Sequence, residues 1–335
     1  MERITPDFSY EKTVLNFTSG YILKGKYFRG SIVKFRTLYR DPEPGTEQVE
    51  MYHFSPREQA VGSVLILHGL GTRNIPFFMW LALRLSCVGV ESSLLILPGH
   101  YTRTAHNSTS GKDYFISNLK RLIKFWEHAV VDVRSSIDLL EQRSMWKENN
   151  CLLGYCLGGM ISVLATALDR RIKHTILLTA GGNMARLLWH SPTLKFTRRG
   201  FARGEGSEES LNSRDELMSR YEQDMRMLDH FESVDEMLQS RIHSLLKVDP
   251  ISYAKFVGKE RTTFVEALFD RALPRDSRRI LWERLGRPRR YFIPLGHVSW
   301  LPFQFLLGEF VLKKMGIRSA RRQLRLLQKL KIEEK

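Results

Sequence analysis

Short, mostly apolar runs recur along the chain and alternate with longer stretches in which apolar residues follow helical spacing. Runs of this kind are typical of strands buried on both faces of a parallel sheet. We therefore predict an α/β protein built on a mostly parallel, doubly wound sheet. In the first part of this α/β core we predict strands at 63–67, 91–97, 150–155 and 174–179. The predicted helices there are 75–88, 113–142 and 159–168.

The sheet is expected to open with a strand hairpin. Segments 31–39 and 47–54 flank residues 41–45, where Asp, Pro and Gly favour a turn. Residues 1–29 show no clear pattern and are interpreted as an N-terminal arm.

A different pattern occupies residues 184–248, in which we find no convincing strand. Segments 215–228 and 234–246 have the spacing of polar amphipathic helices, and 200–213 is typical of a loop. We interpret this region as a helical lid inserted between strands. The predicted organisation is an arm at 1–29, the first part of the core at 30–183, the lid at 184–248, the second part of the core at 249–317 and a basic tail at 318–335. Within the second part we expect strands at 261–269 and 289–294 and helices at 276–285 and 300–315.

The strongest chemical signal lies at residues 154–159, which read Gly-Tyr-Cys-Leu-Gly-Gly between an apolar strand and an apolar helix. This context predicts a sharp strand-to-helix turn that presents Cys156 as a nucleophile. Gly154, Gly158 and Gly159 lack side chains that would clash in such a turn. The helix dipole is then aimed at the sulfur, which favours a nucleophilic thiolate. Cys87 and Cys151 lie in an apolar helix end and a strand, so we interpret them as core residues.

Together with the turn His68-Gly69, this segment resembles the nucleophile elbow of the α/β-hydrolase superfamily, over roughly residues 30–315 in order of elements. A cysteine at the nucleophile position is similar to dienelactone hydrolases and polyhydroxyalkanoate synthases, and the six-residue string is closest to the synthase box. The surrounding sequence matches neither family. The resemblance implies an α/β-hydrolase fold and a triad in the order nucleophile, acid, histidine.

Two carboxylates compete for the acid position. Asp270 follows the predicted strand 261–269 directly and precedes a proline turn, whereas Asp276 has the context of a cap on the next helix, so we favour Asp270. His297 follows the last predicted strand and is the expected base, which takes the thiol proton while Asp270 fixes the ring. The backbone amides of Leu70 and Leu157 are expected to form the oxyanion hole.

Composition narrows the class of protein. The chain has 335 residues, 43% of them hydrophobic, and three cysteines, which is too few for a disulfide framework. We find no signal peptide, no apolar run of membrane-spanning length and no metal motif, and we expect a cytoplasmic protein without metal or cofactor.

The formal net charge of +16 raises the question of an anionic partner. No zinc finger, RNA-recognition motif or helix-turn-helix signature accompanies it, so we expect no nucleic-acid binding. Segment 313–335 carries nine Lys or Arg against two Glu. Residues 319–335 are predicted to form a basic helix with an apolar side, which we expect to pack on the protein's own surface, with peripheral contact with a membrane or another anionic surface as the alternative.

Three functions remain open at this point. The first is hydrolysis of a small-molecule carboxylic ester, lactone or thioester through an acyl-cysteine intermediate with the triad Cys156, Asp270 and His297. The second is acyl transfer from acyl-thioester donors, as the resemblance to polyhydroxyalkanoate synthases implies. The third is a non-catalytic binding protein on the same fold.

Overall fold

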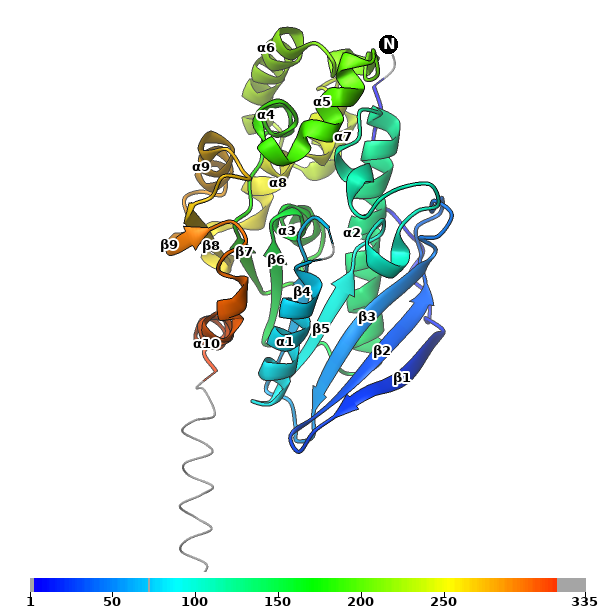
Figure 1. Cartoon of the computed structure of the whole chain (residues 1–335), viewed down its shortest axis with the longest axis vertical. Helices are drawn as coiled ribbons and strands as arrows, with labels where there is room; N and C mark the ends of the chain where they lie inside the picture. The colour runs from blue at the N-terminus through cyan, green and yellow to red at the C-terminus, as the bar shows by residue number, and fades with distance from the viewer. Residues whose placement is uncertain (1–2, 72, 318–335) are drawn as a thin grey trace, which may run out of the picture.

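The computed structural model describes residues 3–71 and 73–317, and in them nine strands form one mixed sheet (Figure 1). The strand order is β1-β2-β3-β5-β4-β6-β7-β8-β9. The pairs from β5 to β9 are parallel, and β1, β2 and β3 add an antiparallel edge. The strands are β1 (Phe17–Lys24), β2 (Phe28–Arg36), β3 (Gln48–Pro56), β4 (Gly62–Leu67), β5 (Val90–Ile96), β6 (Asn150–Tyr155), β7 (His174–Leu178), β8 (Thr262–Phe269) and β9 (Arg289–Gly296).

Helices cover both faces of this sheet, as the unbroken apolar runs require. In β4, Val64 and Ile66 pack into one core with α1 and α10, whereas Leu65 and Leu67 pack into the other with α2, α3, α8 and α9. Because alternate side chains of a strand point to opposite faces, a strand covered on both sides must be apolar throughout. The helices are α1 (Ile75–Ser86), α2 (Leu119–Gln142), α3 (Leu157–Leu168), α8 (Pro250–Val257), α9 (Arg275–Arg284) and α10 (Gln304–Lys314).

The N-terminal segment differs from the predicted arm. Residues 17–24 form the edge strand β1, which pairs with β2. Every residue of β1 is exposed, so it lacks the alternation of buried and exposed positions that would have identified it as a strand.

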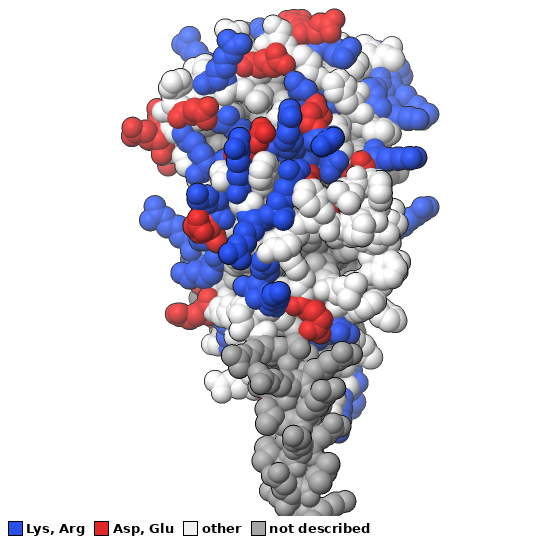
Figure 2. Space-filling view, turned by 90° about the vertical axis from the view of Figure 1, so that its left-hand side faces the viewer, with Lys and Arg blue, Asp and Glu red and all other residues white. Residues whose placement is uncertain are grey.

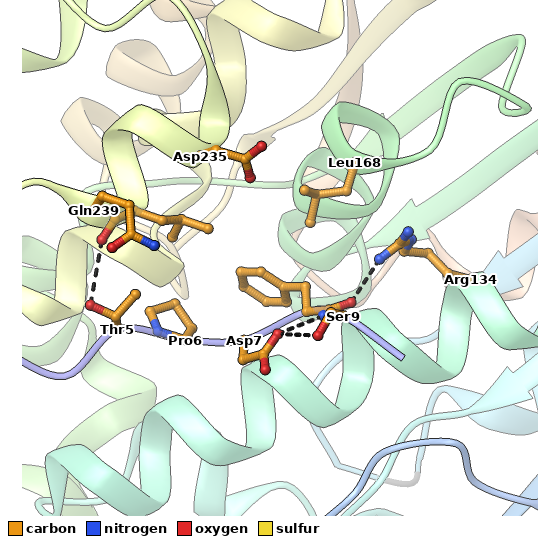
Figure 3. A pocket seen from close by; sticks show the side chains of 10 residues that line it. Thr5, Pro6, Asp7, Ser9, Arg134, Leu168, Asp235 and Gln239 are labelled. Atoms are coloured by element: carbon orange, nitrogen blue, oxygen red, sulfur yellow. Dashed lines mark hydrogen bonds between the residues drawn. The ribbon is translucent and has the colours of Figure 1, made fainter. Parts of the chain in front are cut away.

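Residues before β1 also pack against the body of the protein. The Phe8 side chain is buried, and its carbonyl accepts a hydrogen bond of 2.7 Å from Arg134 of α2. Thr5 donates to the carbonyl of Leu238 in α7 (Val234–Gln239). A cavity of 560 Å³ lies between this segment, α2 and α7 (Figure 3).

Between β7 and β8 the chain forms a helical insertion, which is grouped at the top of Figure 1. Up to Val248, before α8 begins, it holds four α-helices and several short 3₁₀ turns among the described residues. The predicted helix at 234–246 is shorter than expected, because α7 ends at Gln239 and Ser244–Val248 form a 3₁₀ turn. The helices are α4 (Met184–His190), α5 (Lys195–Ala202), α6 (Arg214–Met225) and α7.

One buried carboxylate joins the two ends of this insertion. Asp249 caps α8 and accepts hydrogen bonds from the backbone amides of Asn183, Met184 and Ile251 and from the hydroxyl of Tyr221. Burial raises the pKa of Asp249 above its ordinary value, although the four donors oppose that shift. The start and the end of the insertion are thereby held at the same point beside the sheet.

Candidate active site

The residues predicted to carry chemistry follow the carboxyl ends of parallel strands, and such ends meet at one edge of a sheet. Cys156 follows β6, Asp270 follows β8 and His297 follows β9. His68 follows β4, which is the other neighbour of β6. The helical insertion leaves the sheet after β7, between the strands that carry the cysteine and the acid (Figure 1).

Cys156 occupies the sharp turn that the sequence predicts. Its backbone has φ of 52° and ψ of −113°, a conformation that L-residues rarely adopt and that surrounding structure must enforce. The Cys156 amide donates to the carbonyl of Leu178 in β7 at 2.9 Å, and the Cys156 carbonyl accepts from Met160 of α3 at 3.0 Å. The side chain is therefore held at the start of α3, half-buried, beyond the end of β6.

The glycines around Cys156 are required by close backbone contacts. A Cβ atom on Gly158 would lie 2.4 Å from the carbonyl oxygen of Leu67 and 2.6 Å from that of His68. A Cβ on Gly154 would lie 2.4 Å from the carbonyl oxygen of Gly158. Gly159 passes Ala180 closely, since its Cβ would come within 2.9 Å of the Ala180 Cβ. The turn can form only because these positions carry no side chain.

We expect Gly158→Ala to lower the free energy of unfolding by about 3 kcal/mol or more, because the new methyl group overlaps immobile backbone atoms. Gly20→Ala in β1 is the matched control, since nothing lies within 4 Å of the added Cβ and its φ is ordinary. Urea denaturation of both variants measures the difference. Equal stability of the two variants would contradict the proposed packing of the turn.

Asp270 and His297 are in direct contact. The Nδ1 atom of His297 lies 2.7 Å from Oδ2 of Asp270. The other carboxylate oxygen, Oδ1, accepts the backbone amides of Ala272 at 2.8 Å and Leu273 at 3.0 Å. The turn after β8 thus fixes the carboxylate in the orientation that meets the histidine.

Asp276 does not take this place. Its carboxylate pairs with Arg186 of α4 and accepts the amide of Ser277 at 2.9 Å. The prediction that Asp276 caps the next helix is wrong in one detail. Helix α9 begins at Arg275 with Pro274 at the N-cap, and Asp276 lies in its first turn. The structure therefore brings Asp270, and not Asp276, to His297.

The charge distribution favours protonated His297. Burial acts to lower the pKa of His297, but attraction to Cys156 and hydrogen bonds with Asp270 and Cys156 outweigh it and raise this pKa to about 10. Burial acts to raise the pKa of Asp270. The hydrogen bond and the charge of His297 outweigh burial and hold this pKa below its ordinary value. Because Nδ1 contacts Asp270, Nε2 is the ring nitrogen left for the Cys156 sulfur.

Tyr155 is a site residue that the sequence pattern did not reveal. Its hydroxyl donates to the carbonyl of His297 at 2.9 Å, and its ring centroid lies 5.4 Å from that of His297. A Cβ on Gly69 would come within 2.7 Å of the same ring. A tyrosine at the end of a buried strand is indistinguishable from a core residue in the sequence, so no signal there could have identified it.

The turn after β4 carries Leu70, one of the two predicted oxyanion donors. Asn74 holds this turn, since its side chain accepts the amide of Gly69 at 3.0 Å and donates to the carbonyl of Leu70 at 3.3 Å. Asn74 directly precedes α1, a position at which asparagine is favoured as a cap, but its side chain makes no cap bond to the helix, so the sequence signal would have assigned it another role. Leu157, the other predicted donor, is the first residue of α3, where backbone amides lack partners within the helix.

His68 and His100 lie beneath this turn and are fully buried. His68 accepts the amide of Leu97 through Nε2 at 3.1 Å, and its Nδ1 lies 2.8 Å from the carbonyl oxygen of Gly69. Burial lowers the pKa of His68 to about 4, which keeps the ring neutral. The neutral His68 ring therefore supports the turn from beneath.

No protein-family model and no curated protein matches the sequence, but solved structures share its backbone arrangement. Acetyl xylan esterase 1 from Thermoanaerobacterium sp. JW/SL YS485 aligns over 90% of this chain and 88% of its own, with 12% identity and a TM-score of 0.56. The acetyl xylan esterase from Paenibacillus sp. R4 aligns over 91% and 89%, with 15% identity and a TM-score of 0.54.

The chain has the α/β-hydrolase fold. The acylaminoacyl peptidase of Pyrococcus horikoshii also matches it, over 88% of this chain and 43% of the peptidase, with 12% identity and a TM-score of 0.55. At such low identity these similarities concern the fold alone, so the chemistry of the chain must be argued from its own residues.

Within residues 3–71 and 73–317 no helix is both long and apolar enough to cross a membrane. In the same part of the chain no group of three or more His, Cys, Asp or Glu side chains is arranged to hold a metal ion.

Proposed function

We propose that the protein is a hydrolase of carboxylic esters, lactones or thioesters that works through an acyl-cysteine intermediate. In this proposal Cys156 is the nucleophile, His297 is the general base and acid, and Asp270 orients the histidine. The observation that carries the proposal is the combination of Cys156 at a positive-φ turn with a His297 that bonds to Asp270 at 2.7 Å. A cysteine at this position also occurs in the dienelactone hydrolases that the elbow resembles.

The reaction proceeds in two halves. With the proton of Cys156 already held by His297, the sulfur attacks the acyl carbon, and the bond from that carbon to the leaving oxygen or sulfur breaks as His297 gives this proton to the leaving group. A water molecule then loses a proton to His297 and attacks the acyl-thioester, which releases the acid and restores the thiol. The amides of Leu70 and Leu157 are the proposed donors to the oxyanion in both halves.

The test is a panel of p-nitrophenyl esters, lactones and acyl thioesters, with intact-mass spectrometry during turnover. We expect release of acid and a mass increase of one acyl group, located at Cys156 by peptide mapping. If no panel member is turned over and no adduct forms, the proposal is overturned in favour of the non-catalytic binding protein.

A second candidate function is acyl transfer from a phosphate-bearing thioester such as an acyl-coenzyme A. One observation favours it, a cavity of 410 Å³ between α5 and the segment that follows Gly111. A Cβ on Gly111 would lie 2.7 Å from Cδ1 of Leu70, so this segment adjoins the proposed oxyanion turn. The cavity is lined by Lys112, Ile116, Ser117, Phe196, Thr197, Arg199, Arg203 and Glu205. Arg203 pairs with Glu205 at 2.8 Å, and the two other cations, Lys112 and Arg199, suit a phosphate group.

For this candidate we expect the double variant Lys112→Glu and Arg199→Glu to raise KM for coenzyme A thioesters about tenfold, because two exposed charge contacts are reversed. KM for p-nitrophenyl esters should stay unchanged, since these substrates carry no phosphate. Arg220→Glu on α6 is the control for a change of surface charge elsewhere on the insertion. Equal changes for both substrates would contradict the assignment of this cavity.

A further inference from the structure

Large apolar side chains are exposed in the segments that flank Asp270 and His297. Phe269, which directly precedes Asp270, is 67% exposed, and Val298, which directly follows His297, is 61% exposed. The backbones of β8 and β9 pair at Phe269 and Gly296, so these two exposed residues belong to adjacent strand ends. Exposed apolar groups that gather in one place commonly mark an interaction site.

Further exposed apolar side chains lie at the start of α10, which follows β9 along the chain. Phe303, Phe305 and Leu306 are all exposed, and the rings of Phe303 and Phe305 lie 6.4 Å apart. These residues begin six positions after His297. We call Phe269, Val298, Phe303, Phe305 and Leu306 the apolar rim.

Basic side chains adjoin the apolar rim. Arg271 lies two residues after Phe269 and is exposed. Lys313 is exposed seven residues after Leu306, a spacing that puts both on the same side of α10. Arg275 at the start of α9 is exposed as well, whereas Arg289 is exposed at the opposite end of β9 from Gly296. Figure 2, which faces the β9 side of the molecule, shows Lys and Arg gathered in a broad band beside an area with few charged residues.

Few carboxylates oppose this band in α9 and α10. Glu283 is exposed 3.9 Å from Arg279, and Glu309 pairs with Arg84 of α1 at 3.1 Å. Glu266 of β8 is buried and already paired with Arg278 and Arg290. The side chains available to a partner on this face are therefore mainly cations and aromatic or aliphatic groups.

We propose that the apolar rim docks on an anionic lipid bilayer, with the aromatic and aliphatic side chains in the interface and the flanking cations among acidic headgroups. Exposed Phe and Leu side chains can bury at the boundary between headgroups and acyl chains, and each nearby Lys or Arg adds attraction to acidic lipids. A protein partner would have to match both features with its own apolar and acidic surface, whereas a bilayer supplies them together. Docking in this way places the Cys156 side of the sheet next to the membrane.

The experiment is co-flotation of the full chain with phosphatidylcholine vesicles, with and without phosphatidylglycerol. We expect binding to vesicles that contain phosphatidylglycerol, weakened by added salt because headgroup attraction is screened. Phe305→Ser with Leu306→Ser should reduce the partition coefficient about tenfold, since two apolar contacts are lost. Lys313→Glu should reduce it about fivefold.

The matched control is Tyr21→Ser with Ile22→Ser, which removes two exposed apolar residues from β1 at the opposite edge of the sheet. This variant should bind like the wild type. Binding that is equal in the rim and control variants, or no binding of the wild type, would overturn the proposal. Circular dichroism of each variant separates loss of docking from loss of folding. Because vesicle binding is measured without a substrate, the result is independent of the proposed hydrolysis.

Discussion

Cys156→Ala is expected to reduce turnover of every substrate of the wild type by about four to six orders of magnitude, because no other group can form the acyl intermediate. The acyl adduct should disappear from the intact-mass spectrum at the same time. Since Cys156 lies in a turn that alanine can occupy with the same backbone strain, we expect the variant to fold, which circular dichroism checks.

Cys87→Ala is the control for this experiment. Cys87 lies at the end of α1, where burial raises the pKa of its thiol, so it should be a poor nucleophile. The Cys87→Ala variant should keep full activity and the adduct. Loss of the adduct in this variant, or its survival in Cys156→Ala, would assign the nucleophile elsewhere.

The ring of His297 gives a second readout of the Cys156 variant. In the wild type the pKa of His297 is raised to about 10, in part by attraction to and a hydrogen bond with Cys156. Removal of the sulfur should therefore lower this pKa towards the ordinary value of about 6.5. An NMR titration of the ring protons measures the shift, and an unchanged pKa would contradict the proposed contact between the two side chains.

Asp270→Asn is expected to lower kcat by roughly three to four orders of magnitude, because the amide no longer stabilises the protonated ring of His297. The Asp270→Asn variant should also lower the pKa of His297, since a charge and a hydrogen bond are lost. Kinetics and the NMR titration check the two effects separately.

Asp276→Asn provides the matched comparison, since it makes the same chemical change in the next carboxylate along the chain. Asp276 pairs with Arg186 and does not contact His297, so we expect kcat and the pKa of His297 to stay near their wild-type values. A larger loss of activity in Asp276→Asn than in Asp270→Asn would reverse the assignment of the acid.

Much of the core could be predicted from the sequence because its strands are buried on both faces. Segments such as 63–67 and 150–155 are apolar throughout, and the observed strands β4 and β6 match them within one residue. The turn at Cys156 was also predictable, since glycine on both sides of a residue between a strand and a helix is typical of a sharp nucleophile turn. In contrast, β1 was missed because an exposed edge strand carries no burial pattern.

The sequence by itself determined the α/β class, the order of the core elements and the position of Cys156, since these depend on local patterns of apolar residues and glycine. Only the tertiary structure brought Asp270 rather than Asp276 to His297, added Tyr155 and Asn74 to the site, and left the apolar rim exposed. The contacts of His297 with Asp270 and Tyr155 join residues that are 27 and 142 positions apart along the chain. They arise from the parallel order of β6, β7, β8 and β9, which brings the ends of these strands to one edge.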